Sequence, residues 1–187
     1  MLIGYAICGS FCTHAHALNA VLRLVSAGHT LLPILSERAA TTDTRFGTAN
    51  ALREALVSLT GTSPIESVVD AEPLGPALPL DLLVIAPCTG NTLSKIANGV
   101  SDGTVTLAAK AHLRANRPLL IGLASNDAMS ANLASIATLL ARKSVYFLPM
   151  RQDDPERKPH SLVCDFTTLE ECATLAVEGK QKRPLFL

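Results

Sequence analysis

The sequence has no long apolar run, no basic cluster and little charge of either sign. No apolar segment is long enough to span a membrane, and the start, MLIGYAICGS, lacks the basic flank of a signal peptide, so we expect a first strand there and a cytoplasmic protein. Basic residues do not alternate with aromatic ones, which argues against nucleic-acid binding. Charged residues make up 17% of the chain and apolar residues 48%, with a formal net charge of zero. This balance predicts a large core and favours burial of part of the surface in an oligomer.

The common nucleotide-binding motifs are missing as well. No GxGxxG follows the first predicted strand, so binding of a nicotinamide cofactor in the usual Rossmann manner is not supported. A Walker motif is also absent. Any nucleotide-like cofactor must therefore be held by other turns.

Cysteine and histidine do not form a recognisable site. The 5 cysteines are scattered and odd in number, which is typical of reduced thiols in a cytoplasmic protein. His14 and His16 lie near Cys12, but a single residue between two histidines at a helix start does not direct them to one ion. We therefore expect no metal.

Apolar runs and helical periodicity alternate along the whole chain. This alternation predicts one domain over residues 1–187, with a Rossmann-like three-layer α/β sandwich around a mainly parallel, doubly wound sheet of about six strands. A charged excursion and a last helix occupy about 149–187. The expected strands are 2–8, 31–35, 64–69, 82–86, 118–123 and 145–148, and the expected helices are 17–25, 49–59, 93–100, 104–115, 130–142 and 169–178.

The most informative stretch is residues 82–99, LLVIAPCTGNTLSKIANG. A buried strand is followed by a polar turn and then by a helix, which is the arrangement in which open α/β sheets bind ligands. Thr89 and Asn91 can cap the helix, whose free N–H groups suit an anion or a carbonyl oxygen. An ordinary strand-to-helix turn with a good cap explains the same residues. Cys88 is either a nucleophile at a helix N-terminus or, as we favour, a small packing residue.

Similar turns follow other expected strands. Gly9-Ser10, Ser36 and Ser125-Asn126 each stand at the carboxyl end of a predicted parallel strand. Because such ends meet at one edge of a sheet, the set would suit a phosphorylated planar cofactor.

The loop 41–47, TTDTRFG, combines three hydroxyl side chains with one arginine. Arg45 can grip a carboxylate through two parallel donors, with Thr42 and Thr44 adding hydrogen bonds. The other interpretation is a polar loop in which Asp43 or Thr44 caps the helix 49–59.

Residues of the central turn and the helix after it resemble the motif of a known family. The residues APCTGNT from 86 to 92, followed by Lys95, Ala97, Asn98, Gly99 and Asp102, match the pattern APxTxNTxxKxAxGxxD. The chain thus resembles the flavoprotein family, which includes homo-oligomeric, FMN-dependent cysteine decarboxylases and flavin prenyltransferases.

The resemblance implies an FMN site on the predicted turns. Its phosphate and ring would lie along the turns after the first, second and central strands, and a further turn would close the other side. The first set is Gly9, Ser10, Ser36, Thr89 and Asn91, with Cys88 and Gly90 in the same turn, and the closing set is Ser125, Asn126 and Met129.

Other motifs resemble one group within that family, the flavoprotein components of a two-component oxidoreductase of spore-forming bacteria. They are the segments 41–47, 71–76, 125–128 and 152–155, with Lys158-Pro159. The resemblance implies oxidation of a cyclic dicarboxylate to an aromatic pyridine in the mother-cell cytoplasm, together with a partner protein that carries NAD or NADP. It also implies trimers or multiples of trimers.

One position departs from the decarboxylases of the family. They place a catalytic histidine in the loop before the central strand, where this chain has Glu72 and no histidine, so decarboxylation by that route is not expected. Glu72 is instead the candidate base. The alternatives are non-redox flavin chemistry, such as decarboxylation or prenyl transfer, and a protein that only binds substrate or activates its partner.

Overall fold

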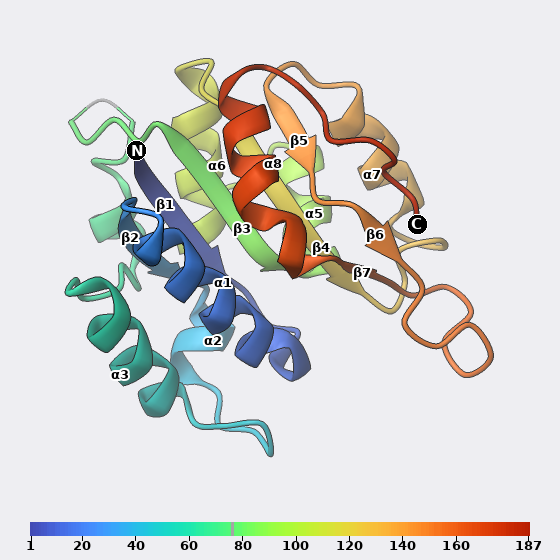
Figure 1. Ribbon diagram of the computed structural model, residues 1–187, viewed down its shortest axis with the longest axis horizontal. Coiled ribbons are helices and arrows are strands. Elements are labelled where there is room, and N and C mark those ends of the chain that lie inside the picture. Colours follow the sequence, from blue (N-terminus) through green and yellow to red (C-terminus); the bar gives the residue numbers. More distant parts are fainter. Residues whose placement is uncertain (76) are drawn as a thin grey trace.

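Five parallel strands form the centre of the protein, in a computed structural model that describes residues 1–75 and 77–187 (Figure 1). Four of them lie in the order β2-β1-β3-β4, and β5 pairs with the first half of β4. The strands are β1 (Leu2–Ile7), β2 (Thr30–Leu35), β3 (Leu82–Cys88), β4 (Leu119–Ser125) and β5 (Val145–Phe147). The predicted parallel, doubly wound sheet is confirmed.

Two short antiparallel strands extend this sheet. The last residues of β4 pair with β7 (Leu162–Cys164), which in turn pairs with β6 (Met150–Arg151). Within the described residues the sheet therefore has seven strands, in the order β2-β1-β3-β4-β7-β6 with β5 off this path.

Helices cover both faces of the sheet (Figure 1). One face is packed by α1 (His14–Ser26), α3 (Ala49–Thr60) and α8 (Leu169–Val177). The other is packed by α4 (Val68–Ala71), α5 (Gly90–Ala97), α6 (Thr104–Arg114) and α7 (Leu133–Leu140). A short helix, α2 (Glu37–Thr41), and two 3-10 turns, Phe11–Thr13 and Phe166–Thr168, complete the structure.

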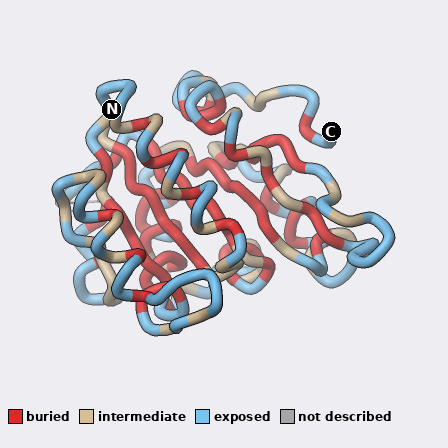
Figure 2. Tube along the Cα trace, turned by 60° about the horizontal axis from the view of Figure 1, so that its bottom comes forward, coloured by how far each residue is buried: buried red, intermediate tan, exposed pale blue. Residues whose placement is uncertain are grey.

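Strand β3 explains why the central stretch is so apolar. It lies between β1 and β4, with helices on both faces, and all 7 of its residues are buried. Figure 2 shows the same pattern for the sheet as a whole, with buried strands and exposed loops around them. A strand covered on both faces needs an uninterrupted apolar run rather than alternation.

The strand expected at 64–69 is wrong. Only Ile65 forms a bridge, to Ile34, and the chain then turns into α4. Ser67 caps that helix by accepting a hydrogen bond from the Asp70 backbone N–H at 3.1 Å. A capping serine with an acidic residue in the first turn outweighs the strand preference of the neighbouring valines.

The charged excursion 149–159 closes on itself. Lys158 Nζ lies 2.7 Å from Asp153 Oδ2, and Gln152 Nε2 donates to the Pro159 carbonyl at 2.9 Å. The Met129 N–H donates to the His160 carbonyl at 2.9 Å, which ties the loop to the turn after β4. Pro76, the last residue of the 71–76 motif, lies outside the described residues. No helix in the described ranges is both long and apolar enough to cross a bilayer.

Candidate functional site

A cavity of about 470 Å³, called here the main cavity, opens at the carboxyl ends of β1, β2 and β3. Gly9 follows β1, Ser36 follows β2 and Thr89 follows β3, so three strand ends contribute to one wall. The site coincides with the point where the strand order reverses around β1, the usual ligand position in such sheets. Its lining is Gly9, Phe11, Ser36, Glu37, Arg38, Thr42, Thr89, Asn91, Thr92, Lys95, Asp102, Gly103, Val105 and Thr106.

A second cavity of about 260 Å³, called here the side cavity, lies across Thr89 from the first. It is bounded by the turns after β1 and β4, by the start of α5 and by the 151–161 loop. Its lining is Ser10, Cys12, Thr13, Thr89, Gly90, Ala124, Ser125, Asn126, Asp127, Asp153, Lys158 and Val163.

The turn after β1 has an unusual backbone. Ser10 adopts a left-handed conformation with φ 55° and ψ 46°, which is uncommon for a residue other than glycine. Its hydroxyl donates to the Ala124 carbonyl at 2.7 Å, which anchors this turn to the end of β4. Such retained strain is typical of functional turns.

Residues at the start of α5 line both cavities. Thr89 is the N-cap, and its Oγ1 accepts a hydrogen bond from the Thr92 N–H at 3.3 Å. Asn91, in the first turn, is exposed. The helix end is therefore capped by a side chain but remains open to an anion or a carbonyl oxygen.

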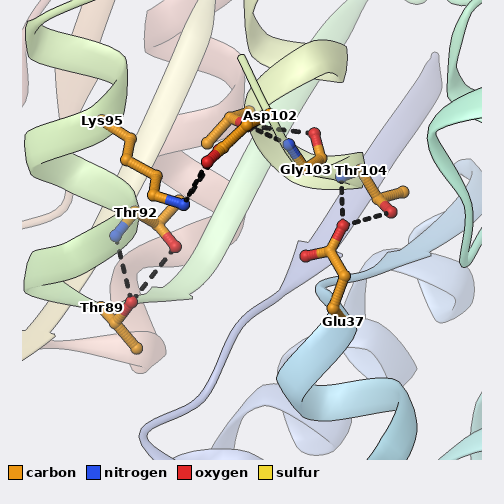
Figure 3. Close-up of polar contacts among 8 residues, drawn as sticks. Glu37, Thr89, Thr92, Lys95, Asp102, Gly103 and Thr104 are labelled. Atoms are coloured by element: carbon orange, nitrogen blue, oxygen red, sulfur yellow. Dashed lines mark hydrogen bonds and ion pairs between the residues drawn. The ribbon is translucent and has the colours of Figure 1, made fainter. Parts of the chain in front are cut away.

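Two carboxylates line the main cavity, and both have partners (Figure 3). Glu37 Oε1 accepts hydrogen bonds from the Thr104 backbone N–H at 2.7 Å and from the Thr104 hydroxyl at 3.0 Å, at the start of α6. Asp102 pairs with Lys95, with both oxygens 2.9 Å from Nζ. This lysine holds the pKa of Asp102 below its usual value.

The predicted cofactor residues divide between the two cavities. Gly9, Ser36, Thr89 and Asn91 line the main cavity. Ser10, Gly90, Ser125 and Asn126 line the side cavity, which also includes Thr89. Met129 instead packs against the core.

Cys88 is a packing residue, as favoured from the sequence. Its side chain is fully buried in the core, and burial raises the pKa of its thiol well above the usual value. Cys8 is also fully buried, and burial raises the pKa of its thiol to about 11, partly offset by a hydrogen bond with Thr92. Neither thiol is suited to nucleophilic chemistry.

The predicted carboxylate-binding loop does not face either cavity as a unit. Thr42 lines the main cavity and also an adjoining hollow of about 120 Å³ beside α3, whereas Thr44 lines the hollow and not the main cavity. Thr44 and Gly47 exchange backbone hydrogen bonds, and the exposed Arg45 guanidinium stacks over the Phe46 ring at 4.8 Å. The structure thus places Arg45 at the exposed surface, outside the lining of the main and side cavities, and its binding role stays a prediction.

The capping interpretation of that loop is right in part. Asp43 Oδ1 accepts a hydrogen bond from the Ala49 N–H at 2.9 Å, at the first residue of α3. The N-cap itself is Thr48, not Thr44.

Glu72, the candidate base, also lies outside both cavities. It is exposed at the C-cap of α4 and is not part of the lining of either cavity. The carboxylates that do reach the main cavity are Glu37 and Asp102. Glu37 and Arg38 directly follow Ser36 at the end of a predicted strand. This position was the sequence signal that could have identified Glu37 and Arg38 as cavity residues.

Histidine and cysteine form no metal cluster in the part of the chain that the structure describes. His14 Nε2 lies 2.9 Å from the Cys8 carbonyl oxygen and stabilises the turn after β1.

The sequence matches one protein family over most of its length. The model of the family described as Flavoprotein matches residues 6–176. The B subunit of dipicolinate synthase from Bacillus subtilis (strain 168) is 40% identical over 185 residues, covering 99% of this chain and 92% of the relative.

Solved structures show the same fold. The crystal structure of the dipicolinate synthase B subunit from Bacillus halodurans superposes with a TM-score of 0.91 at 39% identity, over 100% of this chain and 95% of that one. The FMN-dependent cysteine decarboxylase SpaF superposes with a TM-score of 0.69 at 20% identity, over 95% and 97% of the two chains. The chain therefore belongs to the Flavoprotein family, in the group that contains the dipicolinate synthase B subunits.

Proposed function

We propose that this chain is the B subunit of a dipicolinate synthase, which binds FMN at the main cavity and works with the A subunit to oxidise dihydrodipicolinate to dipicolinate. The observation that carries the proposal is the convergence of the turns after β1, β2 and β3 on one cavity of about 470 Å³. The similarity to dipicolinate synthase B subunits over nearly the whole chain supports the choice of reaction.

The residues present fit a flavin phosphate and ring. Gly9 lets the turn after β1 pack closely against Thr89 in the same wall, because a Cβ at this position would lie only 3.2 Å from Thr89 Cγ2. Ser36 and Asn91 add polar side chains, and the open start of α5 suits negative charge. We propose Gly9, Ser10, Ser36, Thr89, Gly90 and Asn91 as the holding set, with Ser125 and Asn126 closing the far side.

When bound, a flavin supplies an acceptor for the hydride that leaves the substrate. The chain then has to bind the cyclic dicarboxylate, orient its ring and exclude water. The two carboxylates of the main cavity already accept hydrogen bonds, Glu37 from Thr104 and Asp102 from Lys95. Because Lys95 lowers the pKa of Asp102, that carboxylate is a poor proton acceptor, and Glu37 is engaged by the start of α6. The wall is therefore better suited to binding than to general-base catalysis.

This last observation favours a second candidate, an activating protein without redox chemistry. In that case the A subunit by itself transfers the hydride to NAD or NADP, and this chain only positions the substrate. The two candidates differ in whether the flavin changes redox state.

The test is the visible absorption spectrum of the purified chain after incubation with FMN and desalting. We expect the flavin bands to be retained and to bleach when dihydrodipicolinate is added without oxygen. Retained bands that do not bleach would favour the activating role or non-redox flavin chemistry. A colourless protein would overturn the FMN proposal.

A matched pair of variants locates the site. Asn91→Ala, in the first turn of α5, should reduce the retained flavin severalfold. Asn98→Ala, at the opposite end of the same helix, removes an exposed amide that donates to the Ser94 carbonyl and should leave retention unchanged. Equal retention in both variants would place the flavin elsewhere.

A further inference from the structure

Arg38 is the cation of the main cavity that is left without a partner among the described residues. It stands on α2, two residues after the strand end at Ser36, and its side chain lines the cavity. The neighbouring acids are already engaged, Glu37 with Thr104 and Asp102 with Lys95. Within the ranges that the structure describes, the Arg38 guanidinium makes no ion pair and no side-chain hydrogen bond. The N–H donors of this exposed guanidinium are thus free for a ligand.

Thr42 adds a free donor beside this arginine. The Thr42 N–H donates to the Arg38 carbonyl at 3.1 Å, so the two residues are separated by one turn and line the same cavity. Within the described part of the chain, the Thr42 hydroxyl also makes no hydrogen bond. A guanidinium and a hydroxyl that line one cavity suit an oxyanion.

We propose that Arg38, assisted by Thr42, binds one carboxylate of the cyclic substrate and makes the site selective for dicarboxylates. The proposal rests on the proposed function for the identity of the ligand. It assigns to Arg38 the role that the sequence suggested for Arg45, whose guanidinium stacks on Phe46. An arginine can offer two parallel N–H donors to a carboxylate, which accounts for selectivity as well as affinity.

The experiment measures binding of dipicolinate and of picolinate, its monocarboxylate analogue, by calorimetry. It uses the full chain with and without FMN, as wild type, Arg38→Met, Arg38→Lys and the control Arg45→Met. Circular dichroism confirms that each variant is folded.

We expect Arg38→Met to weaken dipicolinate binding by about 10- to 100-fold, the range for a charge-assisted hydrogen-bonded pair. The variant should then bind dipicolinate no better than picolinate. Arg38→Lys should recover part of the preference, and Arg45→Met should behave as wild type. FMN affinity should be the same in all four proteins.

Three results would overturn the proposal. The first is an unchanged preference for dipicolinate in Arg38→Met, and the second is a wild type that binds neither acid. The third is a loss of FMN affinity in Arg38→Met without a loss of riboflavin affinity, since the oxyanion at Arg38 would then be the flavin phosphate. A wild type that binds dipicolinate but never FMN would contradict the proposed flavin site and leave the role of Arg38 intact.

Discussion

The main cavity and the side cavity lie on either side of Thr89, and they differ in how far their polar side chains are already used. In the side cavity, Ser10 donates to Ala124, and Ser125 donates to Asn132 Oδ1 at 2.9 Å. Asp153 there is occupied by Lys158 and by the buried Ser161 hydroxyl. Most of its donors and acceptors thus stabilise the protein itself.

In the main cavity, some polar side chains have no hydrogen-bond partner within the described part of the protein. Glu37 and Lys95 have partners, but in the described structure the side chains of Arg38, Thr42 and Asn91 have none. Because donors that are already satisfied gain little from a ligand, recognition is expected where donors are free. Changes at the engaged side chains of the side cavity should therefore mainly alter stability, and changes at the free side chains of the main cavity should mainly alter binding of the dicarboxylate.

The largest effect is expected at Gly90, in the wall beside the side cavity. A Cβ added there would lie 1.9 Å from Asn132 Oδ1 and 2.7 Å from Ser125 Oγ, so the wall must shift. Gly90→Ala should lower the free energy of unfolding by about 3 kcal/mol, the upper range for overpacking. Urea unfolding followed by circular dichroism measures this change.

Gly9→Ala is the matched variant at the main cavity. Its Cβ would meet only Thr89 Cγ2, at 3.2 Å, so we expect a loss below about 1 kcal/mol together with weaker FMN retention. If Gly90→Ala unfolded at the same urea concentration as wild type, the wall at Gly90 would be no more tightly packed than the wall at Gly9, and the comparison would fail.

The next effect is expected at Glu37, which joins the main cavity to α6. Glu37→Ala removes two hydrogen bonds and a negative charge from the start of that helix, and should cost about 1.5 kcal/mol of unfolding free energy. Glu37→Gln keeps a hydrogen-bond acceptor without the charge. Its free energy of unfolding should lie between those of wild type and Glu37→Ala. Glu54→Ala, an exposed carboxylate on α3, is the control and should change stability little.

The outcome separates two roles for Glu37. A stability loss with unchanged FMN retention assigns it to holding α6. If Glu37→Ala were as stable as wild type, the hydrogen bonds from Thr104 would not contribute to holding α6.

Much of the fold could be predicted because buried parallel strands have a simple signature. The run from Leu82 to Ala86 is apolar throughout, and such a run between helical segments has few alternatives. The small polar turns at strand ends could be predicted for the same reason, since they interrupt the apolar pattern at defined points. Gly9, Ser36 and Thr89 do line one cavity.

The choice between Arg38 and Arg45 could not be made from the sequence. Helix α2 has 5 residues, too few to show helical periodicity, and its position depends on the contact of Glu37 with Thr104, 67 residues away. The loop 41–47 attracted attention because it is rich in hydroxyls, yet its direction is set by the backbone pairing of Thr44 with Gly47. Local composition does not determine which way a side chain points.

The smallest effect is expected at Asp153, and it tests the side cavity directly. The hydrogen bond from Lys158 is the main cause of the lowered pKa of Asp153, with Ser161 contributing. A carboxyl whose pKa is lower in the folded state adds stability above its unfolded pKa of about 4, and loses it as the pH falls through the folded value. Asp153→Asn should therefore cost about 0.5 kcal/mol at neutral pH, as for a partly exposed ion pair.

The same variant should flatten the loss of stability below about pH 4, because the titrating group is gone. Glu156→Gln, an exposed carboxylate in the same loop, is the control and should follow the wild-type pH profile. FMN and dipicolinate affinities should be unchanged in both variants, since Asp153 is already satisfied by Lys158 and Ser161. A weaker dipicolinate affinity in Asp153→Asn would show that the side cavity takes part in recognition, and the division between a binding wall and a stabilising wall would no longer hold.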